Sequence, residues 1–150
     1  MTLQNLLAIQ RLQAHTPDGA AIRKLLEAAR RNLADAHVTQ VSADNRFDAA
    51  YKCIMQCAML GLWANGYRTA TSQPGHHQTA IQSLGLTMQV PAPDLIVLDA
   101  LRRKRNLSDY EGDPVSGATL ASCVGEAAKL LAHTERWLTL MHPDWMNGKA

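Results

Sequence analysis

Apolar residues recur at steps of three and four along most of the chain, which is the spacing of one face of an α-helix. The pattern predicts helices over residues 2 to 13, 18 to 37, 45 to 65, 76 to 88, 95 to 110 and 114 to 141. Because no stretch alternates apolar and polar residues, no strands are expected. The sequence therefore predicts an all-α protein, an antiparallel four-helix bundle with additional short helices.

Polar and proline-containing stretches separate the predicted helices. Ser42 or Asp44 can cap the helix that follows "VTQVSADN", since both side chains accept hydrogen bonds from free backbone N–H groups. Asp113 followed by Pro114 is a suitable start for the last helix. These breaks agree with the helix boundaries that the periodicity predicts.

A chain of 150 residues is expected to form a single domain. Its core is predicted at about residues 18 to 140. A short N-terminal helix is expected within residues 1 to 15, and a frayed tail over residues 142 to 150.

Composition and charge restrict the class of protein. The formal net charge is only +2, so any binding of nucleic acid requires a local basic patch. The apolar run "CIMQCAMLGLW" is too short to span a bilayer, so no membrane association is expected. Cys53 and Cys57 lie four apart in that run, which indicates core residues of a cytoplasmic protein and not a disulfide framework.

The basic segment "LRRKRNLSDYEG" contains one arginine in an unusual position. On a helix, Arg105 continues the apolar stripe of Leu98 and Leu101, whereas Lys104 points to another side and is expected in solvent. A guanidinium on a core-facing stripe needs a partner, and Asp109 is four residues further on. Arg105 is therefore expected either to form a buried structural pair with Asp109 or to open into a cleft and bind phosphate.

Two further sets of polar residues are candidate sites. Arg103, Asn106 and Tyr110 share another stripe of the same predicted helix. His76 and His77 have no acidic or cysteine partner at a metal-binding spacing. No metal site and no cofactor are therefore expected, and the simplest interpretation of the histidines is a helix start with one ring packed inward.

The order of four segments resembles the HEPN family (higher eukaryotes and prokaryotes nucleotide-binding) over roughly residues 18 to 140. The segments are "FDAAYKCIMQCAMLGLWANGYR", "GHHQTAIQSL", "LDALRRKRNLSDYEG" and the long final helix. The resemblance implies a helical bundle that pairs as a homodimer. It also implies a metal-independent RNase or toxin, often accompanied by a small nucleotidyltransferase as antitoxin.

The signature of active HEPN proteins is an Arg, a polar residue, a short gap and a His. In this chain the resemblance places the Arg at Arg105, the polar residue at Asn106 and the His position at Tyr110. A phenol titrates near pH 10 and is a poor proton shuttle at neutral pH. The favoured hypothesis is therefore a dimeric binding or partner-regulated protein with a degenerate RNase motif, which binds RNA or a nucleotide.

Several alternatives remain at this point. The protein can be an active RNase in which His76 or His77 replaces the missing His, and Tyr110 can instead accept a nucleotidyl group from a partner enzyme. The third alternative is a dimerisation module in which Arg105 and Asp109 form a buried pair and Tyr110 caps the helix. The residues expected to contact a ligand are Arg103, Arg105, Asp109, His76 and His77.

The homodimer has support in the residues as well as in the resemblance. The helix over residues 45 to 65 is apolar on most of its surface. Met55, Met59 and Trp63 exceed what the core of one bundle is expected to cover, so part of this helix is predicted to face a second copy.

Overall fold

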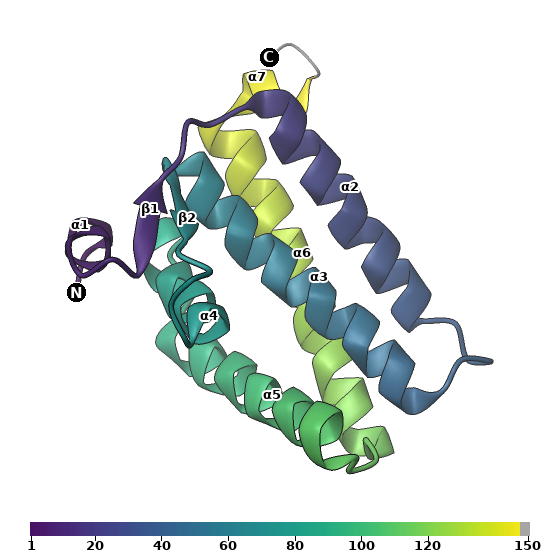
Figure 1. Ribbon diagram of the computed structural model, residues 1–150. Helices are drawn as coiled ribbons and strands as arrows, with labels where there is room; N and C mark the ends of the chain where they lie inside the picture. The colour runs from purple at the N-terminus through teal and green to yellow at the C-terminus, as the bar shows by residue number, and fades with distance from the viewer. Residues whose placement is uncertain (148–150) are drawn as a thin grey trace.

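The computed structural model describes residues 1–147, which are mostly helical (Figure 1). The helices are α1 (Leu3–Ala8), α2 (Gly19–Ala36), α3 (Ala43–Ala64), α4 (His76–Thr87), α5 (Ala92–Glu111), α6 (Gly117–Met141) and α7 (Pro143–Met146). The strands are β1 (Leu12–Ala14) and β2 (Tyr67–Thr69). The helical class predicted from the apolar spacing is confirmed.

Helix α3 is the centre of the fold and packs against α2, α4, α5 and α6. In Figure 1, α3 and α6 run in the same direction, and α2 runs in the opposite one. Ser42 caps α3 as predicted, because its side chain accepts a hydrogen bond from the backbone N–H of Asn45 at 3.2 Å. More than half of the 22 residues of α3 are buried, including Cys53 and Cys57.

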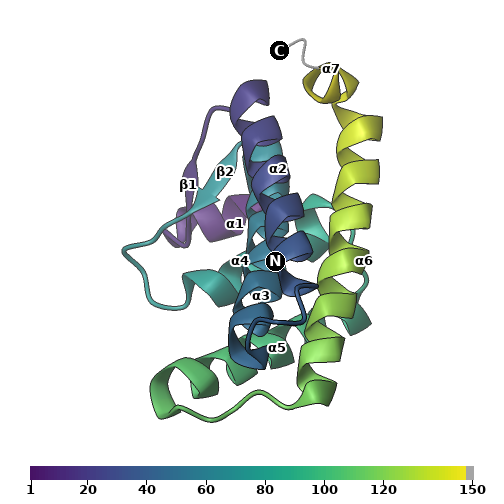
Figure 2. The same ribbon diagram turned by 90° about the vertical axis from the view of Figure 1, so that its right-hand side faces the viewer.

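Helix α5 is packed much more sparsely than α3. Leu98 and Leu101 are its only fully buried residues within the part of the chain that the structure describes. Figure 2 shows α5 lying across the lower ends of α3 and α6, with its last turns pointing away from α6. The end of α5 that carries Arg105 is therefore only partly covered.

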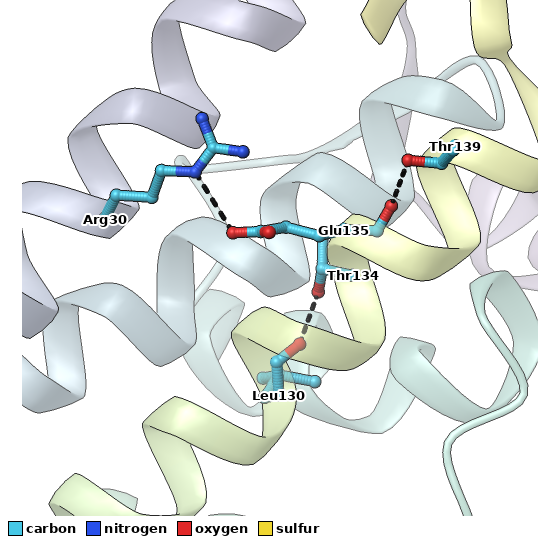
Figure 3. A network of polar contacts seen from close by, with 5 residues as sticks. All are labelled: Arg30, Leu130, Thr134, Glu135 and Thr139. Atoms are coloured by element: carbon cyan, nitrogen blue, oxygen red, sulfur yellow. Dashed lines mark hydrogen bonds and ion pairs between the residues drawn. The ribbon is translucent and has the colours of Figure 1, made fainter.

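A contact between polar side chains joins α2 to α6 (Figure 3). Arg30 Nε on α2 lies 3.1 Å from Glu135 Oε1 on α6. On α6 itself, the hydroxyls of Thr134 and Thr139 each donate to the backbone carbonyl four residues earlier, at 2.8 Å. These bonds give both hydroxyls an acceptor within their own helix.

The small sheet was not predicted. Strands β1 and β2 pair antiparallel, with Leu12 opposite Thr69 and Ala14 opposite Tyr67. Three residues are too few to show alternation, and the pairing joins segments far apart in the sequence. The predicted helix over residues 2 to 13 therefore ends at Ala8, and the loop after α3 begins with a strand.

Helix α6 ends at Met141 as predicted, but its start and the segment that follows it differ from the prediction. Its N-cap is Ser116, whose side chain accepts a hydrogen bond from the Thr119 N–H at 3.1 Å, and not Asp113. The predicted tail begins with α7, and its residues 148–150 lie outside the described part of the chain. Within residues 1–147, every helix is too short or too polar to cross a bilayer.

Candidate functional site

A groove of about 510 Å³ lies beside the middle of α3. Helix α3 forms most of it, and α2, α4 and α5 each contribute one side chain. Its lining residues are Leu25, Asp48, Tyr51, Lys52, Met55, Gln56, Met59, His77 and Arg105. The groove brings together ionisable and apolar side chains from four helices.

One face of α3 explains the mixed lining. The six groove residues of α3 follow each other at steps of three and one, so they share one side of the helix. This set comprises Asp48, Tyr51, Lys52, Met55, Gln56 and Met59. The methionines that suggested an apolar excess in the sequence thus lie beside polar residues: Met55 is buried and Met59 is half-buried.

Tyr51 is the most buried polar group of the groove, with only 3% of its surface exposed. Its ring stacks on Phe47, one turn earlier, at a centroid distance of 6.5 Å. Its hydroxyl lies 3.2 Å from Nδ1 of His77. Burial raises the pKa of Tyr51 to about 12, so the phenol keeps its proton at neutral pH.

His77 enters the groove from the first turn of α4. The preceding Gly75 has φ 78°, a left-handed conformation that favours glycine and turns the chain into the helix. The His76 ring meets His77 edge-on at 4.7 Å. Burial, and then the charges of His76, Arg105 and Arg102, lower the pKa of His77. Its imidazole is therefore neutral at pH 7.

Arg105 lies over the ring of Tyr51, with the guanidinium carbon 5.3 Å from the ring centroid. Its Nε also pairs with Asp109 Oδ2 at 2.9 Å. The side chains of Arg105 and Asp109 are 31% and 32% exposed, respectively. The pair is therefore not the buried structural pair of the sequence alternative, because both groups retain access to water.

Asp48 adds a second carboxylate to the charges around Arg105. Burial raises the pKa of Asp48, and the negative charge of Asp109 raises it further, whereas Arg105 acts in the opposite direction. Both effects place Asp48, Arg105 and Asp109 in one electrostatic cluster. Groups with shifted pKa values that line one cavity are typical of functional sites.

The predicted site residues divide between the groove and the surface. Arg105 and His77 line the groove, and His76 is half-buried beside His77. Arg103 is 72% exposed and pairs with Asp99 at 3.1 Å. Tyr110 is 84% exposed, so it does not cap the helix as a packed residue, and Asn106 is half-buried. Of these residues, only Arg105 and His77 line the groove.

Tyr51 and Asp48 were missed as site residues. Tyr51 falls among the apolar residues of its helix, so its sequence position is typical of a core aromatic. The available signal was the narrow polar line of Asp48, Lys52 and Gln56 along an otherwise apolar helix. A polar line next to buried residues marks the edge of a groove when the neighbouring helix leaves it uncovered.

The chemistry of the groove favours an anion over a metal ion. Within residues 1–147, no three His, Cys, Asp or Glu side chains lie close enough together to hold a metal. Arg105 offers planar N–H donors, which suit the oxygens of a phosphate group. The apolar side chains of Leu25, Met55 and Met59 offer space for a flat, uncharged part of the same ligand.

A second cavity next to α5 is a weaker candidate. It has a volume of about 30 Å³, enough for ordered water but not for an organic ligand. Two of its charged residues, Asp94 and Lys129, already pair with each other at 2.8 Å. The groove at Arg105 therefore remains the candidate site.

Comparison with known proteins does not assign the chain to a family. No family model, no curated protein and no solved structure matches it.

Proposed function

We propose that this protein is a HEPN-like, cytoplasmic, dimeric protein that binds the phosphate group of a nucleotide or of RNA in the groove at Arg105. The observation that carries the proposal is a half-buried guanidinium that lines a groove of about 510 Å³ together with Tyr51 and His77. In this proposal α2, α3, α5 and α6 are the four helices of the HEPN-like bundle.

The polar end of the groove suits a phosphate ester. Arg105 supplies charge and N–H donors, and the ring of Tyr51 fixes the guanidinium from one side. The imidazole of His77 can exchange its hydrogen bond with Tyr51 for one with the ligand. Base or sugar atoms of the ligand then lie against Met55 and Met59.

The test is a titration with adenosine 5′-monophosphate and with a short single-stranded RNA. Arg105→Ala is expected to abolish binding of both, and Arg105→Lys to weaken it, because lysine keeps the charge but loses the fork of donors. Arg103→Ala is the matched control, since Arg103 lies on the same helix but is 72% exposed and paired with Asp99. Equal binding by wild type and Arg105→Ala would contradict the proposal.

The partner of this protein is proposed to be a nucleotidyltransferase. Tyr110 suits modification by such an enzyme, because its side chain is 84% exposed near the end of α5. Co-expression with a candidate nucleotidyltransferase is expected to add the mass of one or more nucleotidyl groups, and Tyr110→Phe is expected to abolish the shift. An unchanged intact mass would exclude this role for Tyr110.

A second function, metal-independent RNA cleavage, is favoured by the position of His77. When Nδ1 of His77 donates its proton to the Tyr51 oxygen, Nε2 is free to accept a proton from a ribose 2′-hydroxyl. The 2′-oxygen then attacks phosphorus and the bond to the 5′-oxygen breaks, giving a 2′,3′-cyclic phosphate. A water molecule protonates the 5′-oxygen to a 5′-hydroxyl, and the imidazolium of His77 returns its proton to the solvent. Arg105 offsets the charge that develops on the phosphate.

Cleavage of a labelled RNA in the presence of a metal chelator tests this second function. His77→Gln and Arg105→Ala are each expected to abolish it, and His76→Gln is the control from the neighbouring position. If the wild-type protein binds this RNA but the RNA stays intact, RNase activity is excluded and the proposed binding function still holds.

A further inference from the structure

The candidate site already holds an anion of its own. Asp109 Oδ2 lies 2.9 Å from Arg105 Nε, so one of the guanidinium donors is occupied by a carboxylate of the same helix. The two residues are four apart on α5, which places them one above the other on one face. Arg105 therefore faces the groove with part of its charge neutralised.

Asp48 increases the negative charge at the same point from the opposite helix. It lines the groove from α3, and its titration responds to Asp109 as well as to Arg105. The cluster thus has two carboxylates for one guanidinium, with the exposed Lys52 as the other cation of the lining. A phosphate that enters the groove has to compete with these carboxylates for Arg105.

We propose that the carboxylate of Asp109 competes with the ligand for Arg105. A phosphate-bearing ligand then binds Arg105 only when its phosphate displaces this carboxylate. This inference rests on the function proposed above, and it concerns how the same site is regulated. The closed form is the one in which Arg105 and Asp109 are paired.

The position of Asp109 makes the exchange feasible. Its side chain is 32% exposed, and it lies three residues before the left-handed Gly112 that ends α5. The released carboxylate can therefore be solvated without unfolding the helix. An ion pair that is partly exposed contributes little to stability, so a phosphate with two or more oxygens can replace it.

The size of the effect depends on the fraction of molecules in the open form. The apparent dissociation constant of a ligand is raised by the inverse of that fraction. If about one molecule in ten is open, removal of the Asp109 charge lowers the dissociation constant about tenfold. The change is expected for any ligand that contacts Arg105 through phosphate.

The experiment measures binding of adenosine 5′-monophosphate and of a short single-stranded RNA to wild type, Asp109→Asn and Asp109→Ser. Glu111→Gln is the matched control, because it removes the same charge from an exposed residue at the end of the same helix. Circular dichroism verifies that each variant is folded. The two probes distinguish a free nucleotide from a polynucleotide as the source of the phosphate.

Tighter binding of either probe by both Asp109 variants, with Glu111→Gln close to wild type, supports this competition. Binding by Asp109→Asn where wild type shows none supports it as well. Wild type can bind the probe and lose this binding with Arg105→Ala, while the Asp109 variants bind no tighter than Glu111→Gln. In that case Asp109 does not compete with the ligand, and the proposed function stands. Absence of binding by wild type and by both Asp109 variants overturns the proposed function and the competition by Asp109 together.

Discussion

At the scale of single residues, the partial exposure of Arg105 decides between a structural and a binding role. A buried pair that loses one partner is typically destabilised by about 3–5 kcal/mol. An exposed pair contributes only about 0–1 kcal/mol, and a cation over an aromatic ring adds a comparable amount. Arg105 and Asp109 belong to the second class, because each is nearly one-third exposed.

Arg105→Ala is therefore expected to lower the free energy of unfolding by only about 1 kcal/mol. Chemical denaturation of wild type and variant provides the measurement. A loss of about 3 kcal/mol or more would instead assign Arg105 to the support of the fold.

The environment of His77 predicts a dependence of stability on pH. Its pKa in the folded protein lies below the ordinary value of 6.5, because burial and neighbouring positive charges disfavour the imidazolium. Below about pH 6.5 the unfolded chain therefore binds more protons at this residue than the folded protein does. The free energy of unfolding is expected to decrease as the pH falls through this range.

His77→Gln removes this contribution, since glutamine stays neutral and can still bond with Tyr51. The loss of stability between about pH 7.5 and about pH 5.5 is expected to be smaller in the variant than in wild type. Part of the dependence will remain, because burial also lowers the pKa of His142. Identical losses in the two proteins would show that His77 makes no such contribution.

The inward direction of Arg105 was predicted from the sequence, whereas its neighbours in space were not. Arg105 falls on the stripe of Leu98 and Leu101, and helical periodicity alone is enough to show this. The contact with Tyr51 depends on how α5 crosses α3, which local spacing does not determine. For the same reason, His77 was a candidate with no evident route to Arg105 until the fold placed both in one groove.

At the scale of elements, the close contact between α3 and α4 depends on one glycine. A Cβ added to Gly61 would lie 2.7 Å from the Thr87 hydroxyl, which is too short for a non-bonded contact. That hydroxyl is buried and has no hydrogen-bond partner among residues 1–147. Thr87 therefore has no bond that would be lost if its side chain moved, but the surrounding core leaves little room for the movement.

Gly61→Ala is expected to lower the free energy of unfolding by about 1–3 kcal/mol, because it overpacks this contact. Gly125→Ala is the control: apart from its chain neighbours and the backbone of α6, no atom of residues 1–147 lies within 4 Å of its added Cβ. The variant is therefore expected to gain about 0.5–1 kcal/mol from helix propensity. Thr87→Ala combined with Gly61→Ala should recover part of the loss. Denaturation midpoints that are equal in Gly61→Ala and Gly125→Ala would contradict this account.

Most helices were predicted within a few residues, and the strands were not predicted at all. The long helices α2, α3 and α6 have apolar spacing over many turns, so their existence depends little on tertiary context. Strands β1 and β2 exist only because they pair with each other. Ser116 was not predicted as the N-cap of α6, because the Asp113–Pro114 pair is a stronger local signal for the start of a helix.

At the scale of the whole molecule, the exposed apolar side chains that suit a dimer interface lie on α5 and not on α3. Met55 is buried, and the half-buried Trp63 packs against the ring of His15, so α3 presents a smaller apolar surface than its sequence indicates. Helix α5 instead exposes Ile96 by 72% and Leu107 by 43%. These two residues are about three turns apart and share one side of the helix, and an apolar side of a helix that is left in solvent suits an interface.

Leu107→Glu is therefore expected to shift the protein from dimer to monomer in sedimentation experiments, because it places a charge in the apolar contact. Leu86→Glu on α4 is the control, since Leu86 is exposed to a similar extent, 38%, but lies on another helix. A wild-type protein that sediments as a monomer would remove the dimer from the proposed function.

The pairing of β1 with β2 has a consequence for the order in which the chain folds during synthesis. Strand β1 leaves the ribosome about 55 residues before its partner, which corresponds to roughly 3–10 s of translation. During that time the backbone groups of residues Leu12–Ala14 have no strand to pair with. When β2 emerges, the Ala70 N–H bonds to the Arg11 carbonyl, and Arg11 reaches the Pro74 carbonyl just ahead of His76 and His77. The segment that contains β1 thus supports the loop before His76 and His77 only after α3 has been synthesised.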